Sequence, residues 1–373
     1  MILGIDASGY FETLASGVSY FAHGQPVEPL KLLADQGVHY LRIRVWKNPY
    51  SLEGKPYHGG GCDYANYIKL SKLAMGLGYS IVLDPHMSDF WTDPAKQTMP
   101  KGWEKLNEAE LLNAVNDYTY GLFSDSKRDG VSPAYIQLGN EITNGMLWPY
   151  AHLGEGSPRA HYDHLVKILK IMSANARKVF PKAQLIIHLE RSQDNAVYRE
   201  FFDQMVLAKV DYDIIGMSYY PYWHGGFDTL FANIDDMESR YGKAVMIMET
   251  SYAFTLDDYI KDPDGKSKLV LSPERVQALP YRLPEPLTSE GQVAFLKKLL
   301  ALAKQHHVLG LFYWEPFWIP GKKMTSWSSL EGVAYTGESH AGTRNEVANQ
   351  CLFGYDGEAL PGLYEWKLPK GGK

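Results

Sequence analysis

Two glutamates follow apolar runs of the sequence, where a carboxylate at a strand end could carry out acid–base chemistry. Glu141 comes after Tyr135–Leu138, and Glu249 comes after Met246–Met248. If the two runs are strands four and seven of one barrel, the two side chains face each other across its mouth. One carboxylic acid could then protonate a leaving oxygen while the other carboxylate attacks carbon or activates water, which is the chemistry that glycoside hydrolysis requires.

The distance between the two carboxyl groups would decide the stereochemistry: about 5–5.5 Å permits direct attack and retention, whereas about 6.5–9.5 Å admits a water molecule and gives inversion. The structural alternative is that each glutamate ends its strand in an ion pair that serves the fold, with Arg44 as a partner. Other acids compete for the role. Glu190 is followed by Arg191, which favours a local ion pair, and Asp89 and Glu315 also stand at predicted strand ends.

Polar and aromatic side chains gather at the same strand ends and could hold a sugar. Asn140 could donate its amide to a hydroxyl beside the reacting carbon, and Arg44 could hold a carboxylate ionised. His86 could bind a hydroxyl, and tryptophans offer flat faces to sugar rings. The structural alternatives are a turn residue, a buried ion pair, a histidine satisfied by its neighbours and core rings. The candidates for substrate contact are Arg44, His86, Asp89, Trp91, Asn140, His188, Tyr219, Trp223 and Trp314, with Trp318 as a further ring.

The elements that must position these residues are eight apolar, β-branched runs. Several are nearly continuous in apolar residues, as expected for strands that are covered on both faces. We predict strands over Ile2–Ser8, Val38–Trp46, Tyr79–Met87, Ala134–Ile142, Gln184–Glu190, Tyr212–Tyr222, Ala244–Tyr252 and Val308–Trp318.

Helix signals lie between these runs. Pro29 suits a first helical position ahead of a stop at Gly37, and Asn107 with Glu110 resembles a capping box. The predicted helical segments are Pro29–Gln36, Tyr64–Gly78 capped by Asp63, Leu111–Phe123, a run from Ser157-Pro158 to Phe180, Asp228–Gly242, and Val293–His306 opened by Ser289 and Gln292.

Alternating strands and helices imply parallel pairing through right-handed crossovers. Eight such units close most naturally into a (β/α)₈ TIM barrel, and we predict a single α/β domain over residues 1–373 with extended βα loops. An open doubly wound sheet is the competing fold. Against it, no glycine-rich phosphate-binding turn follows the first strand.

Composition excludes several classes of protein. The 373 residues are 45% apolar, enough for a large core, so a disordered or fibrous chain is excluded. The net charge is −6 and no Lys/Arg cluster suggests a phosphate-binding face, so we expect no nucleic-acid partner. No apolar run approaches the roughly 18–20 residues of a membrane helix, so we expect no membrane span. We therefore expect a neutral substrate. We also expect the protein to be a monomer.

The N-terminus MILGIDASGY has neither the basic flank nor the apolar stretch of a signal peptide. We expect a cytoplasmic protein if Met1 is the native start, and a secreted one if a signal peptide was removed. Cys62 and Cys351 have no ligand neighbours at metal spacing and are expected to be free thiols.

Residues 253–286 form a Pro-rich connection that is longer than ordinary βα loops, and we expect it to be a wall of a cleft. Its acidic residues, Asp257, Asp258, Asp262 and Asp264, could offer clustered oxygens to Ca²⁺. Their spacing does not match an EF-hand loop, and a solvated acidic loop is the alternative. We assign no metal and expect no cofactor, with calcium in this loop as the one exception to be tested.

An ordered set of motifs makes the chain resemble glycoside hydrolase family 53, the endo-β-1,4-galactanases, over almost its whole length. The residues that carry the resemblance are Gly37–Trp46, His86–Gln97, Gly139–Glu141, Ser218–Gly225, Met248–Tyr252, Tyr313–Pro316 and Asn349–Phe353.

The resemblance implies a retaining (β/α)₈ glycosidase that cuts β-1,4-galactan internally, as found in pectin side chains and type I arabinogalactan. It implies that Glu141 is the general acid/base and Glu249 the nucleophile, and that Asn140 contacts the sugar 2-hydroxyl. The resemblance also implies a lining of Arg44, His86 and Tyr219 around the nucleophile, with Trp314 as the floor under the reacting sugar.

The sequence departs from the family pattern at two places. Pro85 and Met87 flank His86 where aromatic residues are usual, and the 253–286 loop differs from that of relatives that bind calcium. Two other functions stay open from the residues alone: a retaining barrel hydrolase acting on β-mannan or β-glucan, and a catalytically silent carbohydrate-binding protein.

Overall fold

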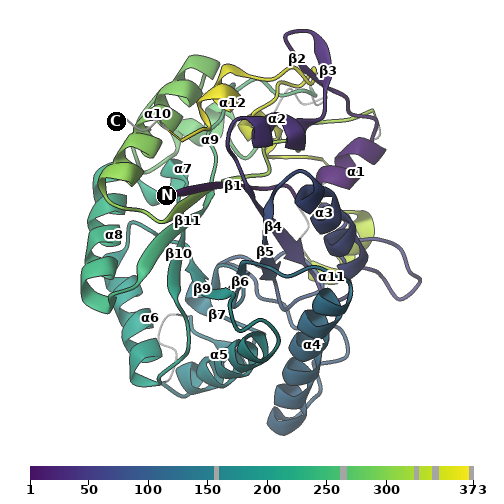
Figure 1. Ribbon diagram of the computed structural model, residues 1–373, viewed down its shortest axis with the longest axis vertical. Helices are drawn as coiled ribbons and strands as arrows, with labels where there is room; N and C mark the ends of the chain where they lie inside the picture. The colour runs from purple at the N-terminus through teal and green to yellow at the C-terminus, as the bar shows by residue number, and fades with distance from the viewer. Residues whose placement is uncertain (155–158, 261–266, 323–326, 338–343, 369–373) are drawn as a thin grey trace.

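The centre of the computed structural model is a closed barrel of eight parallel strands (Figure 1). The structure describes residues 1–154, 159–260, 267–322, 327–337 and 344–368. Going round the barrel, each strand pairs in parallel with the next and the last pairs with the first. The barrel strands are β1 (Ile2–Asp6), β4 (Tyr40–Val45), β5 (Ser80–Pro85), β6 (Tyr135–Gln137), β9 (Gln184–Leu189), β10 (Ile214–Ser218), β11 (Ala244–Thr250) and β12 (Gly310–Trp314).

All eight predicted strands and the predicted barrel are confirmed, although every strand ends before its predicted boundary. The shortening is greatest in β6, which stops at Gln137 because the backbone turns at Gly139, where φ is 93°, and again at Glu141, where φ is 48°. Both values lie in the left-handed region, which cannot continue a strand. The residues that follow β6 therefore leave the strand and lie at the rim of the barrel.

Helices surround the barrel (Figure 1). Three predicted starts are confirmed: Pro29 begins α2, Asp63 caps α3, and Asn107 and Glu110 form a capping box on α4. The main outer helices are α2 (Pro29–Asp35), α3 (Tyr64–Gly76), α4 (Glu108–Arg128), α5 (Arg159–Val179), α6 (Asn195–Leu207), α8 (Phe227–Tyr241) and α10 (Ser289–Gln305).

Other helix predictions need correction. Asp228 lies in the first turn of α8, and the cap position is held by Gly226. Thr288 caps α10 by accepting a hydrogen bond from the Gly291 amide, so Ser289 is the first helical residue. The predicted start at Ser157-Pro158 lies outside the described residues, and α6, capped by Asp194, was not predicted.

Short elements decorate the loops around this frame. The hairpin β2–β3 (Tyr20–Ala22, Gln25–Val27) follows α1 (Tyr10–Ala15), and a second small ribbon joins β7 (Gly145–Met146) to β8 (Ala151–His152). The remaining short elements are η1 (Ile142–Asn144), α7 (Pro221–His224), α9 (Pro273–Gln277), α11 (Leu330–Thr336), η2 (Ala348–Gln350) and α12 (Pro361–Glu365).

The interior of the barrel changes from apolar to charged along the strands. The layer nearer the amino ends of the strands is a separate apolar cluster. It consists of Val82, Ile186, Ile214, Met246, Met248 and Phe312. Gly4 makes room for the Phe312 ring, since a Cβ there would lie 2.2 Å from a ring carbon. Successive inward side chains are two residues apart, so the next layer toward the carboxyl ends is polar. It contains Asp6, Arg42, Asp84, Gln137 and His188, all with no exposed surface.

The described helices include none that is both long and apolar enough to cross a membrane. Cys62 and Cys351 are buried and unpaired, as predicted.

Candidate active site

Glu141 is positioned by a strained turn at the end of β6. Its φ of 48° and ψ of 52° lie in the left-handed region, which is unusual for a residue with a large side chain. Met87, Arg191 and Glu315, which follow three other barrel strands, have φ values of 57°, 53° and 46°. The chain therefore turns sharply at several carboxyl ends of strands, and these turns direct side chains across the barrel mouth.

Glu249 is turned inward by an irregular register in β11. Met246 and Met248 both point into the barrel, so strict alternation would direct Glu249 outward. The pairing with β10 shifts so that Ser218 lies opposite Glu249, and the pairing with β12 shifts between Ile247 and Thr250. Such an irregularity re-aims a side chain, and here it brings the Glu249 carboxylate to the rim.

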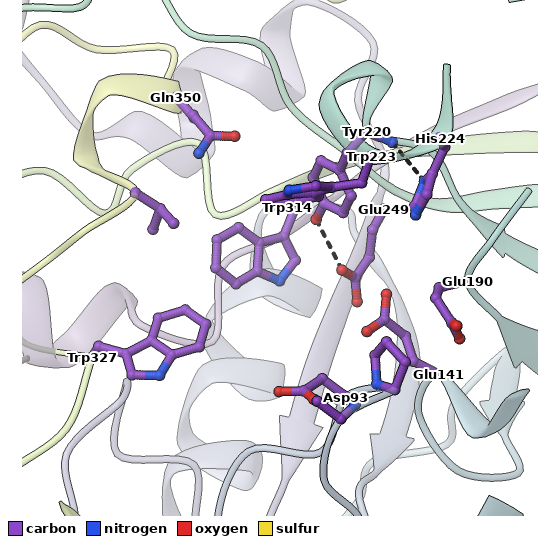
Figure 2. A pocket seen from close by; sticks show the side chains of 13 residues that line it. Asp93, Glu141, Glu190, Tyr220, Trp223, His224, Glu249, Trp314, Trp327 and Gln350 are labelled. Atoms are coloured by element: carbon purple, nitrogen blue, oxygen red, sulfur yellow. Dashed lines mark hydrogen bonds between the residues drawn. The ribbon is translucent and has the colours of Figure 1, made fainter. Parts of the chain in front are cut away.

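The two glutamates meet at the mouth of the barrel, where they line one cavity of about 470 Å³ (Figure 2). Glu141 is 9% and Glu249 7% exposed. One oxygen of each carboxyl group and a ring nitrogen of His188 all lie within 4.8 Å of one another. A smaller recess of about 60 Å³ adjoins the cavity and is bordered by the same two glutamates. The predicted meeting of Glu141 and Glu249 is confirmed.

Glu249 is held by two donors. Arg42 Nη1 donates to Oε1 at 2.8 Å, and the Tyr220 hydroxyl donates to Oε2 at 2.9 Å, as Figure 2 shows for the tyrosine. Both contacts favour the ionised carboxylate because each donor interacts more strongly with a negative charge.

Glu141 is held by a chain of neutral groups. The Ser218 hydroxyl donates to Oε1 at 2.6 Å, and Ser218 Oγ lies 2.9 Å from His188 Nε2. Gln137 Nε2 lies 3.2 Å from the other ring nitrogen, Nδ1. Burial lowers the pKa of His188 well below its usual value, so the ring is neutral. Its Nδ1 also lies 3.1 Å from Asn140 Oδ1. In the described part of the chain, Glu141 has no ion pair.

The surroundings shift the pKa values of the two carboxyl groups by different amounts. Burial, followed by the charges of Glu249 and Glu190, raises the pKa of Glu141 well above its usual value. Burial also raises the pKa of Glu249, but Arg42 and the Tyr220 hydrogen bond oppose that shift. The first proton of the pair therefore leaves Glu249, and Glu141 keeps its proton to higher pH.

A buried network of charges lies under the pair. Besides Glu249, Arg42 bonds Asp6 at 3.1 Å and Asp84 at 2.7 Å. Arg44 bonds Asp6 at 2.9 Å and Glu315 at 2.7 Å. The structural alternative, in which Arg44 pairs with one of the two facing glutamates, is therefore not what the structure has. Arg42, two residues earlier on the same face of β4, makes that contact.

Comparison with known proteins identifies the family of this barrel. The sequence profile of glycosyl hydrolase family 53 matches residues 2–365. The chain belongs to this family. It is therefore an enzyme of the glycoside hydrolase class, and the family expected from its motifs is confirmed.

Three relatives show how far the similarity to family 53 extends. An endo-β-1,4-galactanase of Bacillus subtilis (strain 168) is 31% identical over 392 residues, which is 100% of this chain and 86% of the relative. The Ignisphaera aggregans GH53 catalytic domain has a TM-score of 0.86 at 32% identity and covers 98% of this chain and 95% of its own. A structure of fungal β-1,4-galactanases has a TM-score of 0.76 at 25% identity, covering 98% of both chains.

Six of the predicted substrate-contact residues lie at this family 53 site. Arg44, His86, Trp91 and Asn140 line the recess, Trp223 lines the cavity, and Trp314 lines both. Asn140 is oriented by Nδ2 donating to the Thr92 carbonyl at 2.8 Å. Its oxygen accepts from Arg42 at 2.7 Å.

His86 lines the recess with both ring nitrogens already engaged. Nδ1 accepts from Trp46 Nε1 and from the Thr92 amide, each at 3.2 Å, and Nε2 lies 3.2 Å from Asp84. Its ring therefore positions Asp84 rather than offering a nitrogen to a sugar.

Three predicted contact residues do not line the site. Tyr219 points out of the barrel, where its hydroxyl donates to the Gly225 carbonyl, because alternation along β10 turns Ser218 and Tyr220 inward. Asp89 is buried in an ion pair with Lys101 at 2.9 Å. His188 lies behind Ser218 and acts on the site through it.

Trp318 was also considered as a ring for sugars, but it is fully buried among other tryptophans. Trp91 stacks on Trp327 at 4.3 Å between ring centroids, and the Arg44 guanidinium lies 4.4 Å from the Trp91 ring centre. This aromatic group forms one wall of the recess.

Several residues that line the site or bond its glutamates are outside the predicted contact set. Tyr220 and Arg42 have the inward parity of their strands, a signal that could have selected them over Tyr219 and Arg44. Trp327 and Gln350 come from loops after β12 and have no such signal.

Calcium in the 253–286 loop remains a prediction. The Asp258 carboxylate accepts from Arg344, the Ser267 hydroxyl and the Lys268 amide, so protein donors already occupy it. Asp262 and Asp264 lie outside the described residues. Among the residues that the structure describes, the one cluster of three His, Cys, Asp or Glu ligands is Glu141, His188 and Glu249. The two acids of this cluster are the facing pair, which already have the protein donors described above, so we assign no metal to it.

Proposed function

We propose that this protein is an endo-acting hydrolase of β-1,4-galactosidic bonds in galactan and type I arabinogalactan, working by double displacement. Glu249 is the nucleophile and Glu141 the general acid and base. The names of family relatives support the substrate, since those from Bacillus subtilis and Cellvibrio japonicus are called endo-β-1,4-galactanase and arabinogalactan endo-β-1,4-galactanase.

The observation that carries the mechanism is that two carboxyl groups with unequal surroundings lie close together. One oxygen of Glu141 and one of Glu249 lie within 4.8 Å of each other, which fits the short separation of about 5–5.5 Å in retaining enzymes better than the about 6.5–9.5 Å of inverting ones. Of these two acids, Glu249 pairs with a cation, Arg42 at 2.8 Å, and Glu141 pairs with none among the residues that the structure describes. An ionised group and a protonated group in contact are what the first step needs.

The steps follow from this arrangement. Glu249 attacks the anomeric carbon, while Glu141 gives its proton to the glycosidic oxygen and the bond to the leaving sugar breaks. Glu141, now ionised, takes a proton from water, and that water displaces Glu249 and releases the sugar with its original configuration. Ser218 and Tyr220 hold the two carboxyl groups in place during both steps.

The test is digestion of purified polysaccharides. We expect reducing ends to appear on β-1,4-galactan, with galactooligosaccharides of mixed length forming before free galactose. Equal or greater activity on β-mannan or β-glucan would reject the substrate, and binding without any new reducing ends would reject the enzyme activity. Glu249→Ala is the matched control, because it should bind galactan without cutting it.

A further inference from the structure

Glu190 is a third glutamate of the cavity, and the mechanism above does not use it. It follows β9 with the same inward parity as His188, lines the cavity and is 4% exposed. Arg191 Nε pairs with Oε1 at 3.2 Å and the nearby Thr143 hydroxyl acts to lower the pKa of the group, yet neither carboxyl oxygen accepts a hydrogen bond of normal geometry from any described residue. Buried acceptors are rarely left without donors, and where they are, a ligand often supplies them.

The other acids of the cavity, unlike Glu190, have carboxyl oxygens that accept hydrogen bonds from the protein. Asp93 Oδ1 accepts from the backbone amides of Ala95 and Lys96, and its Oδ2 pairs with the Lys96 side chain at 3.0 Å. Glu141 and Glu249 have the donors described above. Glu190 therefore has acceptor capacity in the cavity that the protein leaves unused.

The place of Glu190 indicates which part of the substrate it faces. Figure 2 shows Glu141 between Glu249 and Glu190, with Trp327 and Gln350 on the opposite side of the pair. Glu141 must protonate the oxygen that departs, while Glu249 attacks the carbon that stays. The departing sugar then lies beyond Glu141 as seen from Glu249, which is the side of Glu190.

We propose that Glu190 binds the departing galactosyl unit, accepting hydrogen bonds from its hydroxyl groups and so directing the glycosidic oxygen toward Glu141. This proposal rests on the galactanase function. Burial raises the pKa of Glu190 to about 7, so in weakly acidic solution the group can donate a hydrogen bond as well as accept one.

The test compares two substrates that differ in their leaving group. One is a galactooligosaccharide, whose departing part is a sugar. The other is 4-nitrophenyl β-1,4-galactobioside, whose departing nitrophenol has no sugar hydroxyls. Glu190→Ala should lower kcat/KM on the oligosaccharide by about 10- to 100-fold, the effect of leaving a buried sugar hydroxyl without its acceptor. On the aryl glycoside it should stay within about 3-fold, since that substrate makes no such bond.

Each variant is assayed at its own pH optimum, so that an effect of Glu190 on the acidity of Glu141 does not count as sugar binding. Glu190→Gln keeps one acceptor oxygen and should recover part of the oligosaccharide activity. If the alanine variant fails to fold, the glutamine variant is compared with the unmodified enzyme on the same two substrates. Glu238→Gln, which removes a partly buried carboxyl group on the outer helix α8, is the control and should change neither substrate.

Equal losses on the two substrates, or no loss on either, would overturn the role of Glu190. Failure of the underlying function gives a different result, because the unmodified enzyme would then leave the galactooligosaccharide uncut.

Discussion

Tyr219 and Tyr220 are neighbours in the chain, yet their hydroxyl groups lie on opposite sides of the barrel wall. The Tyr220 hydroxyl donates to Glu249 at 2.9 Å inside the mouth. The Tyr219 hydroxyl donates to the Gly225 carbonyl at 3.1 Å outside, where its ring packs against Phe295 of α10. Strand alternation thus places one tyrosine at the mouth of the barrel and the other in the packing around the barrel.

This pair provides a matched test by removal of a single oxygen atom. Tyr220→Phe should lower kcat/KM on galactan by about 10- to 100-fold, because the Glu249 carboxylate loses one of its two donors. Tyr219→Phe should leave kcat/KM within about 2-fold and reduce the free energy of unfolding by about 1 kcal/mol. Steady-state kinetics and urea unfolding measure the two effects. The reverse pattern, with activity lost in Tyr219→Phe, would contradict the placement.

Ser218 should tune the acid form of Glu141. Its hydrogen bond acts to lower the pKa of that carboxyl group against the larger effect of burial. Ser218→Ala removes the bond, so the pKa of Glu141 should rise. Because the acid works only when protonated, the alkaline limb of the kcat/KM profile should move to higher pH.

The control for this shift is Ser124→Ala, which removes a hydroxyl that bonds the Gly121 carbonyl on the outer helix α4. Its pH profile should match that of the unmodified enzyme. An alkaline limb that stays in place in Ser218→Ala, or moves to lower pH, would be evidence against Ser218 as the donor to Glu141.

Glu249→Ala should reduce galactan turnover by at least about 1,000-fold while the protein stays folded, because no other group can form the bond to the anomeric carbon. Added azide can enter the space left by the side chain and attack from the same face. The expected product is an α-galactosyl azide, identified by NMR, since only one displacement then takes place. Near-full activity without azide would remove Glu249 from the mechanism.

Asp84 should make the fold sensitive to strong acid. Burial alone would raise its pKa, but Arg42 and His86 lower it from 3.8 to about 2. A lowered folded-state pKa gives stability that is present above the unfolded value and is lost as pH falls through about 2. The unmodified protein should therefore lose about 2 kcal/mol from this group between pH 4 and pH 2.

Asp84→Asn cannot titrate, so its free energy of unfolding should fall by about 2 kcal/mol less over the same interval. Asp35→Asn, at an exposed ion pair with Lys31, should behave like the unmodified protein. Urea unfolding at a series of pH values measures this. Parallel curves for Asp84→Asn and the unmodified protein would show that the Arg42 pairing does not set this acid sensitivity.

The fold was largely readable from the sequence because covered strands give long apolar runs that the helices separate. All eight strands were found from such runs, and capping residues such as Asp63 and Asn107 marked helix starts. Helix α6 was missed although Asp194 accepts a hydrogen bond at its cap.

The site was less predictable because strand-end parity decides which of two adjacent candidates faces inward. Glu141 was found although its inward direction depends on a left-handed turn, and Glu249 was found although alternation alone would turn it outward. In both cases the position directly after an apolar run, together with the family motifs, selected the residue, and strand alternation did not. The predicted contact set contains Tyr219 and not Tyr220, and Arg44 and not Arg42, because the sequence alone does not fix which of these residues face into the barrel.

Residues supplied by long loops had no local signal at all. Trp327 stacks on Trp91, 236 residues earlier in the chain, and bonds it through its carbonyl oxygen. Only the closed fold brings such segments together.

Proton NMR of the first sugar released from galactan tests the central claim most directly. Attack by Glu249 followed by attack of water reverses the anomeric centre twice, so the new reducing end should first appear as the β anomer and reach the α form only by mutarotation. First appearance of the α anomer would mean a single displacement by water, and the assignment of Glu249 as nucleophile would be wrong.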